Sequence, residues 1–364
     1  MPQEQMSPNH IAEKRLISQL LKGNACKTPG DIVQRMGAIQ AQDLPMALWA
    51  VGIRLKGSTV KSVREAFNKG EIIRTHLLRP TWHIVHADDI RWMSELSAPR
   101  IKSSMIARHR QLGLDDKTIK KSNAVIVKTF AHKKYVTRNE LVSGLEGAGF
   151  IMKDNRAAHL LMLAELEGLI CSGEIINNKQ TYALLDERVP KRVQMSRDEA
   201  LARLARKYLT SHGPATKADF SWWSGLPARD VDRAFNILKS DLYSQTDTTN
   251  TYWFIEADTV IKKEERDLYI LPAYDEFIIS YKDRRPSLKS DTGRSVSGNG
   301  VFWPVILEEG IVKGIWKRKI VNDRVTLEMD FFQTPDPDIM HLVEKRVNSY
   351  ADFLDKKAEW TLKE

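Results

Sequence analysis

The sequence has few cysteines and no long hydrophobic run. Its 364 residues include two cysteines, Cys26 and Cys171, which lie far apart and have no partner at metal-ligand spacing. Neither a disulfide-stabilised secreted scaffold nor a structural zinc site is therefore expected. No run approaches the roughly 18 apolar residues of a membrane-spanning helix, and no apolar stretch follows the N-terminal MPQEQMSPNH as in an export signal. We expect a cytoplasmic protein without membrane contact.

Familiar catalytic motifs are absent as well. The chain contains no Gly-rich phosphate-binding loop, no His-Glu-x-x-His helix and no Gly-x-Ser-x-Gly elbow. These absences argue against a P-loop nucleotide hydrolase, a zinc peptidase of that kind and a serine hydrolase. We expect neither a metal nor another cofactor.

The basic charge of the chain is concentrated in its first half. The net charge is +9, from 56 Lys and Arg against 47 Asp and Glu. Residues 1–200 carry 31 basic and 21 acidic side chains, a net +10, and residues 201–364 carry 25 and 26, a net −1. This asymmetry favours a polyanion as partner of the first half. A basic surface that only meets solvent explains the charge equally well.

One structural unit recurs along the chain. In the first clear copy, a capping box of Thr137 and Glu140 begins a short helix, and apolar residues at helical spacing follow in 153–170. Two extended runs then flank a polar turn at Asn177-Asn178. Helix, helix and hairpin in this order describe a winged helix-turn-helix.

The same order returns in residues 196–255. Capping boxes lie at Ser196 with Glu199 and at Thr216 with Asp219, and a polar run at 245–250 separates two short strands. The N-terminal region is a third copy, in which helices begin after Ser7, Thr28 and Asp43 and over residues 59–69, and a hairpin turns at Arg79-Pro80. The agreement indicates an internal duplication.

The last hundred residues differ in character. From about Leu268, short runs rich in Ile, Val, Phe, Tyr and Trp predict a small antiparallel sheet, and a final helix follows Pro337. The predicted fold is α+β, with three tandem winged helix-turn-helix units, a small antiparallel β domain and a C-terminal helix. The predicted domains are residues 1–98, 99–190, 191–262 and 263–364.

The most unusual local pattern is Gln40-Ala41-Gln42-Asp43. Asp43 with Pro45 predicts the start of a helix, so the preceding helix should end near Gln40 and Gln42 should lie in the break. Two amides at i and i+2 point to one side where the backbone is extended. The two glutamines then either converge on a ligand or cap helix ends. Asp43 either caps the next helix or serves as a catalytic carboxylate.

Several segments together resemble the winged-helix DNA glycosylases of the AlkZ and YcaQ group. They are MGAIQAQDLPMALWAVGIRL, RTHLLRPTWHIVHADDI, ADFSWWSGLP, LPAYDEFIISYKDR and GIVKGIWKRKI, in the same order over roughly residues 10–320. The resemblance implies three winged helices, a β-rich C-terminal part and excision of alkylated bases, including N7-alkylguanines and guanine interstrand crosslinks. It also implies that Gln40 and Gln42 are the catalytic pair, in the Gln-x-Gln form of the AlkZ branch.

The expected partner is therefore double-stranded DNA with alkylated bases, bound by a monomer associated with the nucleoid. The resemblance implies that the protein is an enzyme. We expect a monofunctional alkylpurine DNA glycosylase, which hydrolyses the N-glycosyl bond by attack of water. A lyase is not expected, because no lysine adjoins the glutamine pair. The alternative is a non-catalytic winged-helix DNA-binding protein or transcriptional regulator with structural glutamines.

Other residues are candidates for DNA contact. The first wing reads Arg79-Pro80-Thr81-Trp82-His83 where the family usually has Arg-Gly-Thr, and Arg79, Trp82 and His83 are the residues we expect to meet DNA. Arg79 is otherwise a solvated turn residue, and His83, like His76 and His86, otherwise packs in the core.

Two further groups come from the second half of the chain. Lys317 and Arg318, with Lys319, either contact the DNA backbone or protect a sheet edge. We expect Trp222 and Trp223 in the core, with contact to a ligand as the alternative. The acidic Asp275 and Glu276 are expected to pair with arginines, with Arg284 or Arg285 as partners.

Overall fold

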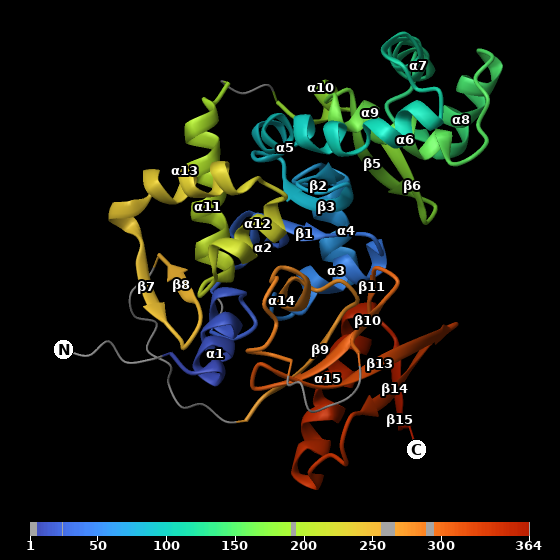
Figure 1. Ribbon diagram of the computed structural model, residues 1–364. Helices are drawn as coiled ribbons and strands as arrows, with labels where there is room; N and C mark the ends of the chain where they lie inside the picture. The colour runs from blue at the N-terminus through green and yellow to red at the C-terminus, as the bar shows by residue number, and fades with distance from the viewer. Residues whose placement is uncertain (1–5, 24, 191–193, 256–265, 289–294, 364) are drawn as a thin grey trace.

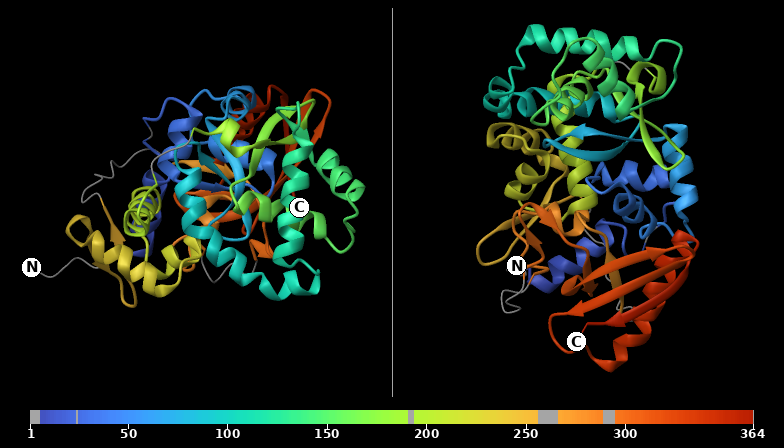
Figure 2. Two further views of the ribbon diagram at one scale, coloured as in Figure 1. Left: turned by 90° about the horizontal axis from the view of Figure 1, so that it is seen from above. Right: turned by 90° about the vertical axis from the view of Figure 1, so that its right-hand side faces the viewer.

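The computed structural model describes residues 6–23, 25–190, 194–255, 266–288 and 295–363. Within them the chain is α+β, as predicted, with helices and several small, separate sheets. Helices α6 (Ile106–Gln111), α7 (Asp116–Thr129) and α8 (Arg138–Gly147) lie at one end of the molecule, and the largest sheet lies at the other (Figures 1 and 2). No helix among the described residues is long and apolar enough to cross a membrane.

The N-terminal helices begin where their capping residues predict. Ser7, Thr28, Asp43 and Thr59 are the N-caps of α1 (Pro8–Ser18), α2 (Pro29–Met36), α3 (Leu44–Gly52) and α4 (Val60–Lys69). The hairpin of β2 (Ile72–Leu77) and β3 (Thr81–His86) turns at the predicted Arg79-Pro80. An N-cap side chain accepts a hydrogen bond from a backbone N–H of the first helical turn, only a few residues away. The helix starts could therefore be predicted from the local sequence.

The glutamine segment is where the local prediction is wrong. The helix expected to reach Gln40 ends at Met36, because Gly37 takes φ +78° and turns the chain out of the helix. Residues Ala38–Gln40 then form strand β1, which pairs with β3 so that Gln40 lies opposite His83. The break is therefore a third strand of the first wing, in the order β1-β3-β2.

The second region is mostly helical. It comprises α5 (Ile90–Ser104), α6, α7, α8, α9 (Arg156–Leu166) and α10 (Leu185–Arg188), with strands β4 (Val136–Thr137), β5 (Ile170–Ile176) and β6 (Lys179–Leu184). The capping box of Thr137 and Glu140 is present. Asn177 and Asn178 have φ +50° and +59° and connect β5 to β6, as tight hairpin turns require.

The third region shares its core with the first. It contains α11 (Arg197–His212), α12 (Lys217–Ser224), α13 (Ala228–Ile237), the 3₁₀ turn η1 (Lys239–Asp241), β7 (Tyr243–Thr246) and β8 (Thr251–Phe254). Tyr208 and Trp223 are buried in one apolar cluster with Ala38, Ile73 and Val85 of the first sheet. Because this core crosses the expected boundaries, the four-domain division stays a prediction.

The C-terminal region holds a five-stranded sheet in the order β15-β14-β13-β12-β9. Its elements are β9 (Leu268–Leu271), α14 (Glu276–Ile279), β10 (Ser297–Gly298), β11 (Val301–Phe302), β12 (Val305–Glu308), β13 (Ile311–Val321), β14 (Arg324–Phe331), η3 (Pro337–Ile339), α15 (Met340–Leu354) and β15 (Lys357–Leu362). The predicted final helix is therefore followed by a strand, β15, which pairs parallel to β14. Tyr350 and Phe353 of α15 pack on Trp49 of α3 at ring-centre distances of 4.9 and 5.0 Å.

A buried ion pair links the first and last regions. Both guanidinium Nη atoms of Arg54 donate to Asp275 at 2.8 Å, and Arg54 also donates to carbonyl oxygens of Gln19 and Ala50. Both charged side chains are fully buried. The expectation that Asp275 pairs with an arginine is right, but the predicted partners Arg284 and Arg285 are wrong.

Removing one member of this pair should strongly destabilise the protein. Arg54→Met leaves the Asp275 carboxylate buried without its counter-charge, which costs about 3–5 kcal/mol. The free energy of unfolding in guanidinium chloride measures this loss. The control is Lys357→Met, which breaks an exposed pair with Asp323 at 3.0 Å and should cost no more than about 1 kcal/mol. Equal losses in the free energy of unfolding for the two variants would show that the buried pair stabilises the protein no more than an exposed pair does.

Candidate functional site

Gln40 is held at both its backbone and its side chain. Its N–H donates to Oε1 of Glu276 at 2.6 Å, across 236 residues of sequence. Its side-chain oxygen Oε1 accepts from Nη2 of Arg79 at 2.8 Å. Gln40 is 8% exposed, so the residue is almost completely buried.

Gln42 is held by the first wing and remains exposed. Its Oε1 accepts from the backbone N–H of Trp82 at 3.0 Å. Between the two glutamines, the Ala41 N–H donates to the Trp82 carbonyl at 2.7 Å, and the Ala41 carbonyl accepts from Nε of Arg74 at 2.9 Å. The segment from Gln40 to Gln42 is therefore fixed by hydrogen bonds at every residue. A polar site held in this way needs little rearrangement to act on a ligand.

Asp43 caps a helix. Its Oδ1 accepts from the Met46 N–H at 3.1 Å at the start of α3, which is one of the two roles expected for it. Tyr274 lies close enough that burial, and then the charge of Asp43, raise its pKa. Tyr274 also has φ +60°, which is unusual for a bulky residue and is found preferentially at functional sites.

The carboxylate of Glu276 is the buried acceptor beneath the site. Besides the Gln40 N–H, it accepts from Nε1 of Trp223 at 3.1 Å and from the hydroxyl of Ser280, and Nε2 of His212 lies 3.6 Å away. Burial alone raises the pKa of Glu276, but the hydrogen bonds and charges of its neighbours, His212 first, outweigh it and lower the pKa to about 2. Glu276 is therefore ionised throughout the physiological range. In place of the expected arginine, the hydrogen-bond donors to Glu276 are the Gln40 N–H, the Trp223 indole and the Ser280 hydroxyl.

The structure contradicts the expected DNA contact of His83. The side chain is fully buried opposite Gln40, so it has no surface for DNA. Its Nδ1 lies 3.1 Å from the Thr81 carbonyl, and its Nε2 has no hydrogen-bond partner among the described residues. Burial, and then the charge of Arg79, lower the pKa of His83 to about 4. His83 is a neutral core residue behind the glutamine pair.

The turn of the first wing fits its proline. The Arg79 N–H donates to the Leu77 carbonyl and the Thr81 N–H to the Arg79 carbonyl, both at 2.6 Å, so the missing N–H of Pro80 is not needed. Gly225 packs against this turn with φ +71°, and a Cβ there would lie 2.6 Å from the Leu78 carbonyl oxygen. The end of α12 is therefore in direct contact with the wing that carries Arg79.

Arg74 is a site residue that the sequence analysis missed. It contacts the Ala41 carbonyl, and its guanidinium lies 4.1 Å from the ring centre of the half-buried Trp82. His76 packs against the same ring in a tilted arrangement, at a ring-centre distance of 4.4 Å, and pairs with the buried Glu165. A single arginine in the apolar run of β2 was the available signal, because a buried strand rarely keeps an arginine without a partner.

The remaining predicted residues are two tryptophans of α12 and two basic residues of β13. Trp223 is buried as expected, but Trp222 is 40% exposed and lies beside Arg79, so the prediction of a core role is wrong for Trp222. Lys317 is exposed on β13, and Arg318 beside it donates to the Tyr350 hydroxyl of α15. The contacts of Arg318 thus belong to the C-terminal sheet and its helix.

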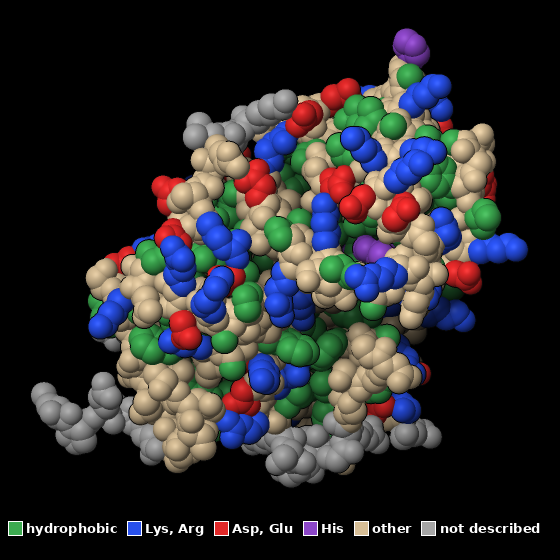
Figure 3. All heavy atoms as spheres, turned by 45° about the horizontal axis from the view of Figure 1, so that its top comes forward, with side chains coloured by type: hydrophobic (Ala, Val, Ile, Leu, Met, Phe, Trp, Pro, Cys, Tyr) green, Lys and Arg blue, Asp and Glu red, His purple; other side chains and the backbone are tan. Residues whose placement is uncertain are grey.

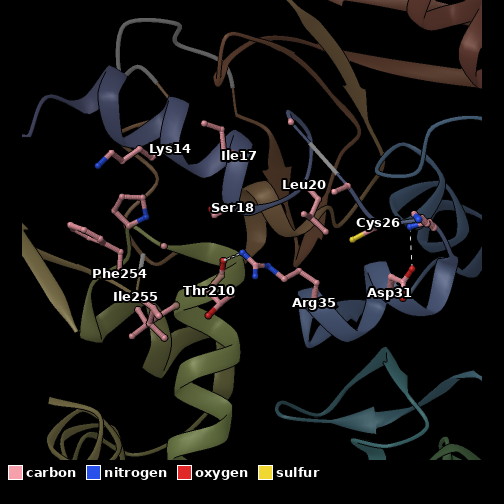
Figure 4. Close-up of a pocket in the computed structure, with 16 residues that line it drawn as sticks. Lys14, Ile17, Ser18, Leu20, Cys26, Asp31, Arg35, Thr210, Phe254 and Ile255 are labelled. Atoms are coloured by element: carbon pink, nitrogen blue, oxygen red, sulfur yellow. Dashed lines mark hydrogen bonds between the residues drawn. The ribbon is translucent and has the colours of Figure 1, made fainter. Parts of the chain in front are cut away.

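A cavity of about 640 Å³ lies away from the glutamines, between α1, α2, α11 and β8. Figure 4 shows Lys14, Asp31 and Arg35 around it, with Arg35 donating to the Thr210 carbonyl at 3.3 Å. The Asp31 carboxylate accepts from backbone N–H groups in a capping box, so it is occupied in holding α2. Large cavities are common ligand sites. Neither Gln40 nor Gln42 is among the residues that line this one.

Comparison with known proteins finds similarity over most of the chain. A family model described as DNA glycosylase AlkZ-like matches residues 33–353. The chain belongs to the AlkZ-like DNA glycosylase family. A relative from Streptomyces sahachiroi, described as an interstrand DNA cross-link repair glycosylase, is 21% identical over 368 residues, covering 93% of this chain and 92% of the relative.

The fold of this AlkZ-like chain also matches a solved structure. Streptomyces sahachiroi DNA glycosylase AlkZ superposes with a TM-score of 0.81 at 19% identity, over 99% of this chain and 100% of the other. The family assignment made from the five sequence segments is therefore confirmed, as is the α+β fold class. No group of three His, Cys, Asp or Glu side chains placed to hold a metal occurs among the described residues.

The surface of this AlkZ-like chain carries many basic groups. Lys and Arg side chains are spread over the face drawn in Figure 3, with fewer acidic side chains between them. In the sequence, the excess of positive charge lies in residues 1–200. A basic face attracts the phosphate backbone of DNA without reading its sequence.

The burial of His83 predicts a loss of stability in mild acid. Because its pKa is about 4 against the usual 6.5, the unfolded chain takes up a proton that the folded chain refuses. The stabilisation is complete above pH 6.5 and is lost as the pH falls to 4, by about 3 kcal/mol. Urea denaturation across this range should show a smaller decline for His83→Asn than for the unmodified protein.

The matched control is His132→Asn, which changes an exposed ring. Its stability should follow the unmodified protein at every pH. Buried His212, whose pKa is lowered first by burial, contributes in the same direction and is present in all three proteins. Parallel curves for His83→Asn and the unmodified protein would show that His83 is protonated in the folded state.

Proposed function

We propose that this chain excises cationic N7-alkylated purines from duplex DNA by hydrolysing the N-glycosyl bond. The observation that carries the proposal is the Gln40-Ala41-Gln42 segment of an AlkZ-like family member, held by the first wing and by Glu276 with Gln42 exposed. The name of the Streptomyces relative supports including guanine interstrand crosslinks among the substrates.

The chemistry suits amides. An N7-alkylguanine carries a positive charge, so its glycosidic bond is already weakened and the base leaves without protonation. The remaining work is to stabilise an oxocarbenium-like sugar and to orient a water toward the anomeric carbon. Carbonyl oxygens of Gln40 and Gln42 on a rigid segment can orient that water, as preorganised dipoles do in other enzymes. Neither amide can act as a general base.

We propose a monofunctional enzyme. A lyase step requires an amine that attacks the sugar, and none of the described hydrogen bonds of Gln40 or Gln42 involves a lysine. Hydrolysis should therefore leave an intact abasic site. No group in this scheme requires a cofactor.

The proposal is tested by incubating the protein with duplex DNA that contains 7-methylguanine. Abasic sites are revealed by alkaline cleavage, and without alkali the strand should remain whole. Excision above a no-enzyme control is expected. Absence of product on several cationic adducts, together with selection of one defined sequence from a random pool, would support a DNA-binding regulator instead.

The glutamine variants should lose activity without losing the fold. Gln40→Ala and Gln42→Ala are each expected to reduce single-turnover excision by about 10²-fold, the usual effect of losing one preorganised polar contact. The control is Gln34→Ala on the exposed face of α2, which should excise normally. If activity falls only in proportion to soluble protein, the glutamines are structural.

Asp43→Asn separates water orientation by amides from base catalysis. Asparagine keeps an oxygen that can accept the Met46 N–H, so the variant should fold and retain most of its rate. The rate of both proteins should be nearly flat between about pH 5.5 and 8, because no catalytic group titrates there. A loss of roughly 10² to 10⁴ in Asp43→Asn, with normal DNA binding, would assign the catalytic role to Asp43.

A further inference from the structure

Trp222 is an exposed aromatic side chain held in a fixed position. It is 40% exposed at the C-terminal end of α12, and its Nε1 donates to the Ile279 carbonyl at 2.8 Å. The close approach of Gly225 to Leu78 keeps this end of α12 against the first wing. The indole therefore presents a rigid surface beside the residues that hold Gln40.

Two arginines from different parts of the chain meet at this indole. The guanidinium carbon of Arg79 lies 5.7 Å from the Trp222 ring centre, and that of Arg284 lies 5.5 Å from it. Arg284 also lies 5.0 Å from the ring centre of Phe302. The hairpin β2-β3 and the segment after α14 thus bring two positive charges to one aromatic group.

Neither arginine forms an ion pair with a carboxylate among the described residues, although the charge of Glu276 raises the pKa of Arg79 and that of Asp219 raises the pKa of Arg284, each against the larger effect of burial. Arg79 donates to the neutral amide of Gln40, and Arg284 donates through Nε to the Ile278 carbonyl at 2.8 Å. Nε of Arg79 and Nη2 of Arg284 are buried and have no acceptor in the part of the chain that the structure describes. The neighbouring Arg285, in contrast, pairs with Asp283 at 2.6 Å.

This arrangement is costly without an anion. Burial lowers the pKa of both Arg79 and Arg284, and the charge of Arg79 lowers that of Arg284 further. Two like charges held close together in a half-buried place repel each other, and their unused donors lack the hydrogen bonds that water would supply. A phosphate group at the exposed part of these two half-buried side chains would offset both charges, because the planar guanidinium matches its oxygens.

We propose that Arg79, Arg284 and Trp222 form a binding site for one phosphate of the DNA backbone next to the damaged nucleotide. The inference rests on the proposed function. A DNA phosphate is favoured over free phosphate because the indole offers a surface for the sugar or base that follows the phosphate. Arg79 also contacts Gln40, so a phosphate on Arg79 places the adjoining sugar near the amide pair.

The test measures binding rather than excision. Duplexes carry a tetrahydrofuran in place of the damaged nucleoside, which no glycosylase can cleave, and a neutral methylphosphonate at one backbone position at a time. For the unmodified protein, one position close to the tetrahydrofuran should weaken binding by about tenfold, since a hydrogen-bonded charge is lost. Arg284→Gln should bind the all-phosphate duplex about tenfold more weakly than the unmodified protein does. A methylphosphonate at that same position should not weaken the binding of Arg284→Gln any further.

Three variants give the salt dependence and the controls. The slope of log affinity against log salt should fall by about 0.9 for Arg284→Gln, the value of one phosphate contact. Arg284→Lys keeps the charge and should keep the slope. Arg285→Gln, whose arginine is exposed and already paired, should keep both the slope and the methylphosphonate effect. Thermal unfolding of each variant shows whether the fold is preserved.

The outcomes separate this inference from the proposed function. If the unmodified protein excises 7-methylguanine but Arg284→Gln still loses affinity at the same methylphosphonate position, the phosphate site is refuted and the glycosylase stands. If the methylphosphonate effect disappears in Arg284→Gln but no adduct is excised, the phosphate site stands without the glycosylase. Inorganic phosphate that protects the unmodified protein but not Arg284→Gln from unfolding, with no methylphosphonate effect, would overturn the DNA assignment.

Discussion

The hydrogen bond between the Glu276 carboxylate and the Gln40 N–H is the contact on which the site depends. It joins strand β1 of the first wing to α14, which precedes most of the C-terminal sheet. The same carboxylate accepts from Trp223 of the third region, so one buried charge holds three distant segments. A buried carboxylate keeps its charge only when several donors surround it, and this requirement fixes the geometry around Gln40.

Two arginines hold the glutamine segment, and one of them, Arg79, is close enough to this buried charge for Glu276 to oppose the lowering of its pKa by burial. Arg74 contacts the Ala41 carbonyl and Arg79 the Gln40 amide, while both are partly shielded from water. Arginines so placed leave the glutamine segment rigid and the neighbouring surface attractive to phosphates. The first wing therefore holds the amides, and under the proposed function it also faces the nucleic acid; the turn at Pro80 keeps its hydrogen bonds.

Much of the fold was readable from local chemistry. Capping side chains predicted the starts of five helices, α2, α3, α8, α11 and α12. Each cap accepts a hydrogen bond from a backbone N–H only three residues further along the chain, so the signal is local. Strand β1 was not predicted, since its three residues are extended only because they pair with distant residues of β3, Ala38 with Val85 and Gln40 with His83. Strand β15 was missed for the same reason.

The site was readable in part. The glutamine pair stood out by its pattern and by family resemblance, whereas its supporting contacts depend on long-range packing. Nothing local shows that Arg54 rather than Arg284 pairs with Asp275, 221 residues away, or that His83 faces inward. Trp222 and Trp223 are neighbours in one helix, and only the packing of α12 decides that one is buried and the other exposed.

The most direct test of the account is a structure of the protein bound to duplex DNA that carries a cationic azasugar in place of the damaged nucleoside. The azasugar mimics the oxocarbenium-like sugar of the transition state. We predict that a water held by Gln40 or Gln42 lies about 3–3.5 Å from the ring position of the anomeric carbon. An azasugar bound against another surface, with both glutamines contacting only protein, would contradict the central claim.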